Sequence, residues 1–333
     1  MRTTDIQNRT TALVKLAAVA LRRRCLTALA MMVVLTYLAA MPAAQAIDWV
    51  SGQVGDWSVG SNWDGGSVPT LSALARFGSG AGSGDAGGEE ATINGIAAQA
   101  DRFIIGQNTP NPTFTSKVIL NSGSLTTDSS TDHRIGQTSE GWLTVNGGTL
   151  DLQNGGYTSD FGGRLIVNGG DINIGRTSTV GGSSAGFVEI NGSSATFDLN
   201  GDYTFGAFGT AIFTADSLSA NVTQVNNTGL LTLNAASKLT IDLSSYDFAS
   251  HAGSNIVLFD YGTLSGTFGT VDIIGGGGTL DYAFDQGGGD PAIALLNVQI
   301  VPEPNCLLMI LAGLAGLCVC RPRRQRWSGD RTA

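Results

Sequence analysis

The sequence predicts an all-β protein built as a parallel β-helix, a solenoid of about six rungs with a tryptophan-containing N-terminal cap and a small C-terminal β cap. Two observations support this fold. A short motif of alternating apolar residues ending in Asn recurs along the middle of the chain, and 47 of the 333 residues are glycine, many of them directly after these motifs. Signal and sorting helices are expected at the two ends of the chain.

In the recurring motif an outward residue lies between two apolar residues, and Asn follows the second of them. Its copies are residues 118–121, 143–146, 165–168, 188–191 and 231–234. The asparagines are 25, 22, 23 and 43 residues apart, and the long interval leaves room for a copy at 211–214 that carries Thr instead. Alternation of period two leaves one face buried and one face wet, so each copy predicts a strand.

Two further strands are expected in each rung. The second has inward apolar pairs, which are Leu150 and Leu152, Ile172 and Ile174, and Phe197 and Leu199. The third ends in an apolar residue followed by Gly, at Ile105, Ile135, Phe161, Val180 and Phe205. One rung cannot bury its own inner face, whereas coils stacked at the ~4.8 Å spacing of paired strands can.

The repeated asparagines predict a structural ladder along the solenoid. Its members are Asn121, Asn146, Asn168, Asn191 and Asn234. Asn tolerates the left-handed backbone of a tight corner, and stacked amides hydrogen-bond to one another. A sugar-binding column of amides is the alternative. The ladder is favoured because Gly follows Asn146, Asn168 and Asn191 directly.

A second polar column is expected from Asp151, Asn173, Asp198 and Asp242, each of which lies between two inward apolar residues. Stacked carboxylates repel one another unless a cation or water intervenes, and Ca²⁺ prefers oxygen ligands. No calcium-loop motif accompanies these residues, however. We therefore expect a solvated face without metal or cofactor, and keep a Ca²⁺ site at Asp151, Asp198 and Asp242 as the weaker alternative.

The solenoid repeats are expected at residues 101–250, between a cap segment at 47–100 and a C-terminal β cap at 251–300. Trp49, Trp57 and Trp63 lie within fifteen residues. Such rings can close the open end of a solenoid, where an uncovered rung exposes apolar side chains and free strand edges. A platform that stacks on carbohydrate is the alternative, and the cap is favoured.

Residues 47–300 contain no cysteine and carry a net charge of about −17. Nucleic acid is excluded as a partner, because binding phosphate requires positive charge. The two histidines, His133 and His251, lie outside metal-ligand spacings, and no nucleophile motif is present. The sequence therefore favours a protein that is not an enzyme. A β-helix polysaccharide lyase or hydrolase is the weakest alternative.

The C-terminus combines a short motif, an apolar run and a basic end. The motif is Val301, Pro302, Glu303 and Pro304, the run spans residues 306–320, and the end (321–326) contains Arg321, Arg323, Arg324 and Arg326. Fifteen apolar residues are fewer than a permanent spanning helix needs, which argues against an ordinary membrane anchor. The arrangement resembles the PEP-CTERM sorting tail (residues 301–326). The resemblance implies an exosortase-type processing enzyme, a transient stay in the inner membrane, and release to the cell surface or exopolysaccharide matrix.

The N-terminus predicts a signal peptide at residues 1–46. Three arginines, 22–24, precede an apolar stretch at 25–41, and Ala44 and Ala46 frame a small-residue cleavage site. The repeats themselves resemble those of bacterial surface proteins of the autotransporter type. We therefore expect an exported, non-catalytic structural protein of the cell surface or exopolysaccharide matrix, with a carbohydrate-binding adhesin as the alternative.

Overall fold

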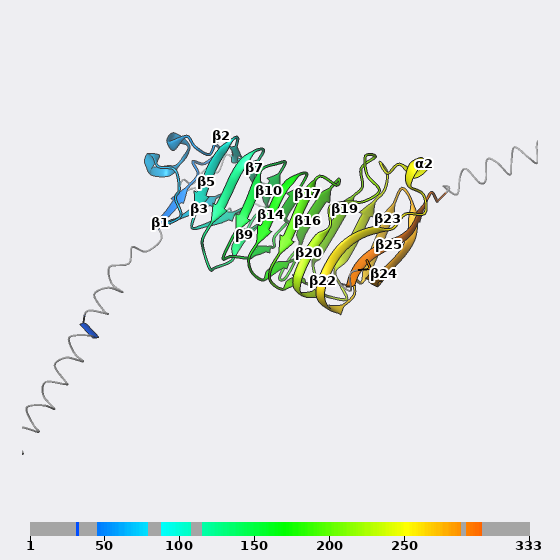
Figure 1. Ribbon diagram of the computed structural model, residues 1–333. Helices are drawn as coiled ribbons and strands as arrows, with labels where there is room; N and C mark the ends of the chain where they lie inside the picture. The colour runs from blue at the N-terminus through cyan, green and yellow to red at the C-terminus, as the bar shows by residue number, and fades with distance from the viewer. Residues whose placement is uncertain (1–30, 33–44, 79–87, 108–114, 288–290, 302–333) are drawn as a thin grey trace, which may run out of the picture. The chain divides into compact units, whose positions relative to one another are not determined.

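The computed structural model describes residues 31–32, 45–78, 88–107, 115–287 and 291–301. By its internal contacts the chain divides into Met1–Gln45 and Ala46–Ala333. In its described residues the second unit is all-β with almost no helix, and its parallel strands stack as a solenoid, which confirms the predicted fold class (Figure 1).

Each complete coil contributes a strand to each of three columns of parallel strands. The first column contains β2 (Val54–Asp56), β4 (Glu90–Ile93), β7 (Ser116–Leu120), β10 (Gly141–Val145), β13 (Gly163–Val167), β16 (Gly186–Asn191), β19 (Gly209–Thr214), β21 (Lys238–Asp242) and β23 (Thr270–Ile274). The second contains β5 (Ile96–Ala100), β8 (Gly123–Thr127), β11 (Thr149–Leu152), β14 (Gly170–Ile174) and β17 (Ala195–Leu199). The third contains β1 (Gln45–Asp48), β3 (Ala73–Phe77), β6 (Arg102–Ile105), β9 (His133–Ile135), β12 (Tyr157–Ser159), β15 (Ser178–Val180) and β18 (Tyr203–Phe205).

The last two coils replace a corner with a continuous strand. β20 (Val225–Leu233) and β22 (Ile256–Gly266) each run from the second column into the third. Counted as complete coils from β4 to β22, the solenoid has about seven turns instead of the expected six. The residues 231–234 counted as a first-column strand belong to the third column, where Leu231 pairs with Tyr203. β4 and β21 supply the coils that the sequence pattern missed.

The interior is filled by inward side chains that stack in register from coil to coil. In the second column, for example, Leu150, Ile172 and Phe197 are consecutive partners, and all three are fully buried. The same strands turn their intervening residues to the outside, as period-two alternation requires. Some polar groups inside pair with one another, as the hydroxyls of the buried Tyr157 and Tyr203 do at 2.5 Å.

Glycine is required where successive corners approach closely. At Gly136 the backbone has a φ of 73°, and a Cβ there would lie 2.0 Å from the carbonyl oxygen of Asp160. Both the left-handed backbone and the lack of space exclude a side chain. Tight corners that contain glycine therefore keep the connections between the strands short.

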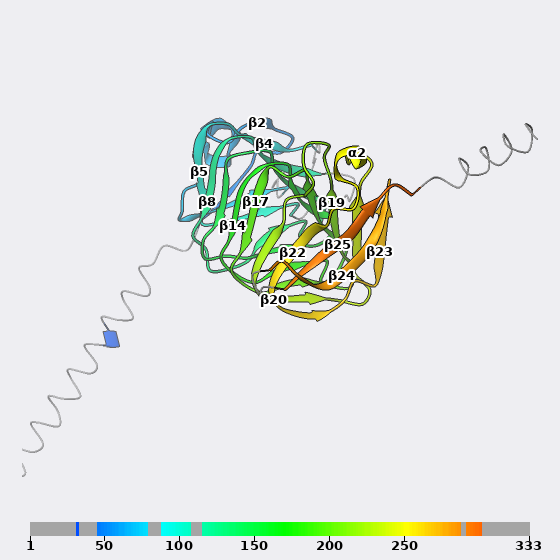
Figure 2. The same cartoon turned by 45° about the vertical axis from the view of Figure 1, so that its right-hand side comes forward.

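The C-terminal end of the stack differs from its middle. β25 (Pro291–Gln299) pairs antiparallel with both β22 and β24 (Gly277–Asp285), and Figure 2 shows these three strands side by side. A short helix, α2 (Phe248–His251), precedes β22 and is capped by the side chain of Asp247. These antiparallel strands match the small β cap expected from the sequence.

The parallel ladder of the first column runs from Val54 to Ile274. It therefore extends on both sides beyond the repeats predicted at 101–250, into the segments expected to act as caps. Between β2 and β3 the chain forms two short 3-10 turns, η1 (Gly60–Asn62) and η2 (Asp64–Gly66), instead of a second-column strand. The first coil is thus part of the stack and closes it at the same time.

Candidate functional site

The outer edge of the first column carries a ladder of asparagine amides. The Nδ2 groups donate to the Oδ1 of the previous coil, from Asn121 to Asn94 at 2.9 Å, and at 2.7 Å from Asn146 to Asn121, Asn168 to Asn146 and Asn191 to Asn168. Four of the five predicted ladder residues therefore stack as expected. Asn94 is a member that sequence reasoning missed, although it follows the same pattern at residues 91–94.

Asn234 does not belong to this ladder. In the first column Asn191 is followed by Thr214, and Thr214 by Asp242. Asn234 instead follows the third-column part of β20, where its Oδ1 accepts a hydrogen bond from the N–H of Ala236 at 2.9 Å. A long turn at residues 215–224 separates β19 from β20, and this insertion displaced the sequence period.

The second polar column alternates between carboxylates and amides. Asp151, Asn173, Asp198, Asn226 and Asp260 are consecutive partners along the second column. Asn226 donates to Oδ1 of Asp198 at 2.7 Å. Because an amide separates each pair of carboxylates, the repulsion that motivated a cation does not arise along this column.

The weak Ca²⁺ hypothesis for Asp151, Asp198 and Asp242 is therefore contradicted by their positions. Asp151 and Asp198 are two coils apart, and Asp242 lies in another column, the first, where it is the strand partner of Thr214. Over the described residues, no group of three or more His, Cys, Asp or Glu side chains could hold a metal ion.

A third outer column stacks cations on aromatic rings, and no sequence motif predicts it. Lys117, Trp142, Arg164 and Phe187 are consecutive partners in the first column. The Arg164 guanidinium lies 5.7 Å from the Trp142 ring centroid and 4.2 Å from that of Phe187. It also pairs with Glu189. Cations on the ring faces stabilise this column, so neither ring is free for a ligand on those faces.

The tryptophans of the first coil are buried, which contradicts the carbohydrate-platform alternative. Trp49 and Trp57 are fully inaccessible and Trp63 is 1% exposed. The Trp63 ring packs edge-on at 4.8 Å from each of the other two rings and 5.5 Å from Phe77. Its Nε1 donates to the carbonyl of Trp57 at 2.8 Å. These rings have no face available to a sugar, and they fill the interior of the first coil.

His133 is likewise an interior residue. Its ring stacks on Phe103 at 4.5 Å, Nδ1 accepts from the N–H of Phe103 at 3.3 Å, and Nε2 lies 3.0 Å from Oγ1 of Thr127. This pattern assigns a neutral ring whose Nε2 carries the hydrogen. Burial, with the nearby charge of Arg102, lowers the pKa of His133 to about 3. The ring has no access to solvent, so it does not serve as a base for an outside substrate.

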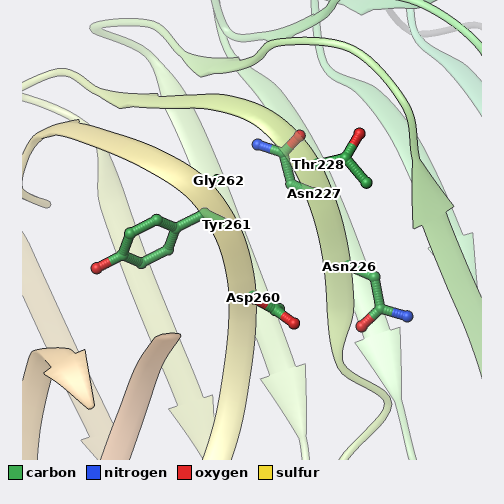
Figure 3. Close-up of a pocket in the computed structure, with 6 residues that line it drawn as sticks. All are labelled: Asn226, Asn227, Thr228, Asp260, Tyr261 and Gly262. Atoms are coloured by element: carbon green, nitrogen blue, oxygen red, sulfur yellow. The ribbon is translucent and has the colours of Figure 1, made fainter. Parts of the chain in front are cut away.

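A groove of about 230 Å³ lies where β20 and β22 pair across a register shift (Figure 3). It is lined by Asn226, Asn227, Thr228, Asp260, Tyr261 and Gly262. In Figure 3 the side chains of Asn226 and Asn227 leave β20 on different sides, in keeping with the outward and inward alternation of the strand.

Most polar groups of this groove already have partners within the protein. The Tyr261 hydroxyl donates to the carbonyl of Tyr282, and Oδ1 of Asn227 accepts from the N–H of Gly229 at 3.1 Å. The Nδ2 of Asn227 is buried and has no hydrogen-bond partner among the described residues. The groove has one carboxylate in its lining, Asp260, whereas glycoside hydrolysis uses a pair. Its chemistry suits a bound water or a small polar molecule.

The predicted sorting and signal residues lie almost entirely outside the described residues. This holds for Pro302, Glu303, Pro304, the four arginines from Arg321 to Arg326, and Ala44; Val301 is exposed, and Ala46 belongs to β1. Among the residues that are described, no helix has the length and apolar character needed to cross a membrane.

Comparisons of the chain with protein families, with curated proteins and with solved structures find no match.

Proposed function

We propose that this chain is an exported, non-catalytic structural protein of the cell surface or exopolysaccharide matrix. The observation that carries the proposal is the uninterrupted first column of nine parallel strands, along which asparagine amides hydrogen-bond to one another from coil to coil. A catalyst on such a scaffold needs long loops that build a cleft, and most corners here are only a few residues long. A stiff rod whose outer amides already hydrogen-bond to one another suits a load-bearing or spacing role.

Export and sorting are the second part of the proposal, and the sequence supports them. The tail that begins at Val301 would be processed by an exosortase-type enzyme after a transient stay in the inner membrane, and the rod would pass to the exopolysaccharide. The acidic charge of residues 47–300 agrees with a partner other than nucleic acid.

The decisive experiment is intact-mass analysis of the protein recovered from its native host, from both membrane and matrix fractions. We expect a matrix form that lacks both the first 46 residues and the basic end. A matched pair of variants, Glu303→Ala and the exposed Ser250→Ala, separates sorting from folding. Glu303→Ala should leave the protein in the membrane fraction, while Ser250→Ala should behave as the wild type. An unprocessed cytoplasmic chain of full mass would refute the proposal.

The enzymatic alternative has its own test. Purified protein is incubated with neutral and acidic polysaccharides, and release of reducing ends or unsaturated uronates is followed. Turnover that survives purification to homogeneity would overturn the non-catalytic assignment.

A further inference from the structure

The turn after β12 holds an aromatic residue in a conformation that does not suit it. Phe161 has a φ of 48° and Gly162 a φ of 77°, and the N–H of Gly163 donates to the carbonyl of Asp160 at 2.7 Å. Two successive left-handed residues suit Asn, Asp or Gly, whereas a bulky residue is strained there. The Phe161 side chain is also 47% exposed, so burial does not offset this strain. The sequence pattern predicts Phe161 at the end of the third strand of its rung, but Ser159 occupies that position.

A small hollow of about 50 Å³ lies beside this ring, with Arg134, Gln137, Thr158 and Ser183 in its lining. Arg134 is exposed, and no carboxylate of the described residues forms an ion pair with it. The Oε1 of Gln137 is buried without a hydrogen-bond partner in the described part of the chain. The lining of the hollow therefore includes a guanidinium without an ion pair, an amide oxygen without a hydrogen bond and a partly exposed aromatic ring.

The one carboxylate in this lining is already used by the protein. Asp160 accepts hydrogen bonds from the backbone N–H groups of Ser183 and Ser184 at 3.1 and 3.3 Å, and from the Ser183 hydroxyl at 3.1 Å. It thus tethers the turn of the next coil. Its charge is not available as a ligand for a cation in the hollow.

We propose that this corner binds a neutral polysaccharide. A sugar hydroxyl both donates and accepts, so it satisfies Gln137 and Arg134 together, and the C–H face of a pyranose fits the negative face of the Phe161 ring. An anion would satisfy Arg134 and leave the buried acceptor of Gln137 unpaired. The net charge of about −17 over residues 47–300 also repels polyanions. The hollow holds one edge of a sugar ring, and the rest of the ring lies over Phe161.

A second exposed ring extends the surface along the axis. Phe208 is 56% exposed and lies at the same corner two coils further, after β18. Two coils correspond to roughly 10 Å. The corner between them, residues 181–185, contains only Gly, Ser and Ala and is bonded to both neighbours, through Gly162 N–H to Ala185 O and Phe208 N–H to Gly181 O. An extended polysaccharide running along the axis can therefore contact both rings across a low, polar gap.

The inference deepens the proposed function, because it gives a matrix protein its contact with polysaccharide. Its test uses the purified full-length chain in mild detergent and is independent of export. Binding is measured by calorimetry against panels of neutral hexose and N-acetylhexosamine oligosaccharides, with oligouronates as the acidic panel. We expect binding within the neutral panel.

Three variants sharpen the test. Phe161→Asn relieves the strained turn, so it should raise the denaturation midpoint and yet weaken binding roughly tenfold. Arg134→Gln should weaken binding by a similar factor. Leu218→Asn, at an 89%-exposed residue in the turn between β19 and β20, is the matched control and should bind as the wild type.

Three results would overturn the proposal: no binding across the neutral panel, binding restricted to oligouronates, or unchanged affinity in Phe161→Asn. None of them bears on whether the chain is exported, which the mass analysis decides separately.

Discussion

The first coil and the coils from β7 to β19 are stabilised in different ways. The first coil, β1 to β3, is filled by the rings of Trp49, Trp57, Trp63 and Phe77. The later coils are filled mainly by aliphatic side chains in register, and amides bond along their outer edge. A coil inside the stack has a neighbour on both sides, whereas the first coil has one within the described residues.

This difference explains why the repeat pattern fades toward the N-terminal end. An inner coil needs side chains that match those above and below, so its sequence repeats. The end coil must also close the stack, and large rings cover the interior where the next coil is missing. The need to cover the apolar interior therefore produces a regular motif in the inner coils and a group of tryptophans in the first coil.

The largest expected effect comes from breaking the aromatic end. Trp63→Ala removes a ring that is 1% exposed and contacts the other three rings of the cluster. We expect a loss of about 3–5 kcal/mol in the free energy of unfolding, measured with urea. Leu71→Ala, at a 39%-exposed residue of the same segment, is the control and should lose far less. Equal losses of unfolding free energy in the two variants would show that the aromatic cluster does not stabilise the N-terminal end of the stack.

A buried histidine makes the inner coils sensitive to acid. The pKa of His133 is about 3 in the folded chain and 6.5 as its ordinary value. Below pH 6.5 the His133 ring therefore becomes protonated in the unfolded chain, whereas it stays neutral in the folded chain down to about pH 3. Above pH 6.5 this residue has no effect on the free energy of unfolding; between pH 6.5 and 3 it lowers that free energy by about 1.4 kcal/mol per pH unit.

The measurement compares urea midpoints at pH 7.5, 5.5 and 4.5 in the wild type and in His133→Gln, which keeps one donor and one acceptor but does not titrate. The difference in slope isolates His133 from the carboxylates. Identical slopes would contradict the neutral, buried ring.

A smaller effect of opposite sign is expected at the corner of the inner coils. Phe161→Asn replaces a bulky left-handed residue with one that accepts this backbone, so it should stabilise the fold by about 1 kcal/mol. Thermal or urea unfolding measures the change. A destabilised variant would mean that the exposed ring contributes to folding after all.

The smallest effect is expected from the outer ladder. Asn168→Ala removes two amide hydrogen bonds of 2.7 Å, one to Asn146 and one from Asn191. Because these amides are exposed, the expected loss is about 0.5–1 kcal/mol. Asn200→Ala, an exposed asparagine outside the ladder, is the matched control. If both variants lose the same free energy, the ladder adds nothing beyond ordinary surface amides.

Much of the inner region could be predicted from the sequence because the motif reports alternation directly. Asn121, Asn146, Asn168 and Asn191 follow strands whose apolar residues face inward, and a structural ladder was the expected outcome. Asn234 shows the limit of this reasoning. It follows the same motif, but the insertion at residues 215–224 shifts the chain by one column, and only the pairing register reveals the shift.

The tryptophans and the corner of Phe161 show two other limits. Sequence spacing left the role of Trp49, Trp57 and Trp63 open between a cap and a sugar platform, because burial depends on what the neighbouring coil covers. Phe161 matched an inward pattern, yet β12 ends at Ser159, so Phe161 lies two residues further on, in the corner, and is exposed. The sequence Asp160-Phe161-Gly162-Gly163, which is typical of a turn, was the signal that Phe161 lies in a corner.

The sequence alone determined that the chain is a β-solenoid, because alternation, period and corner glycines are local features that each coil must satisfy by itself. The tertiary structure decided which column each strand joins, which rings are buried, and which outer carboxylates are neighbours. Those outcomes depend on the register between coils, and register is set by contacts among residues that lie more than twenty positions apart.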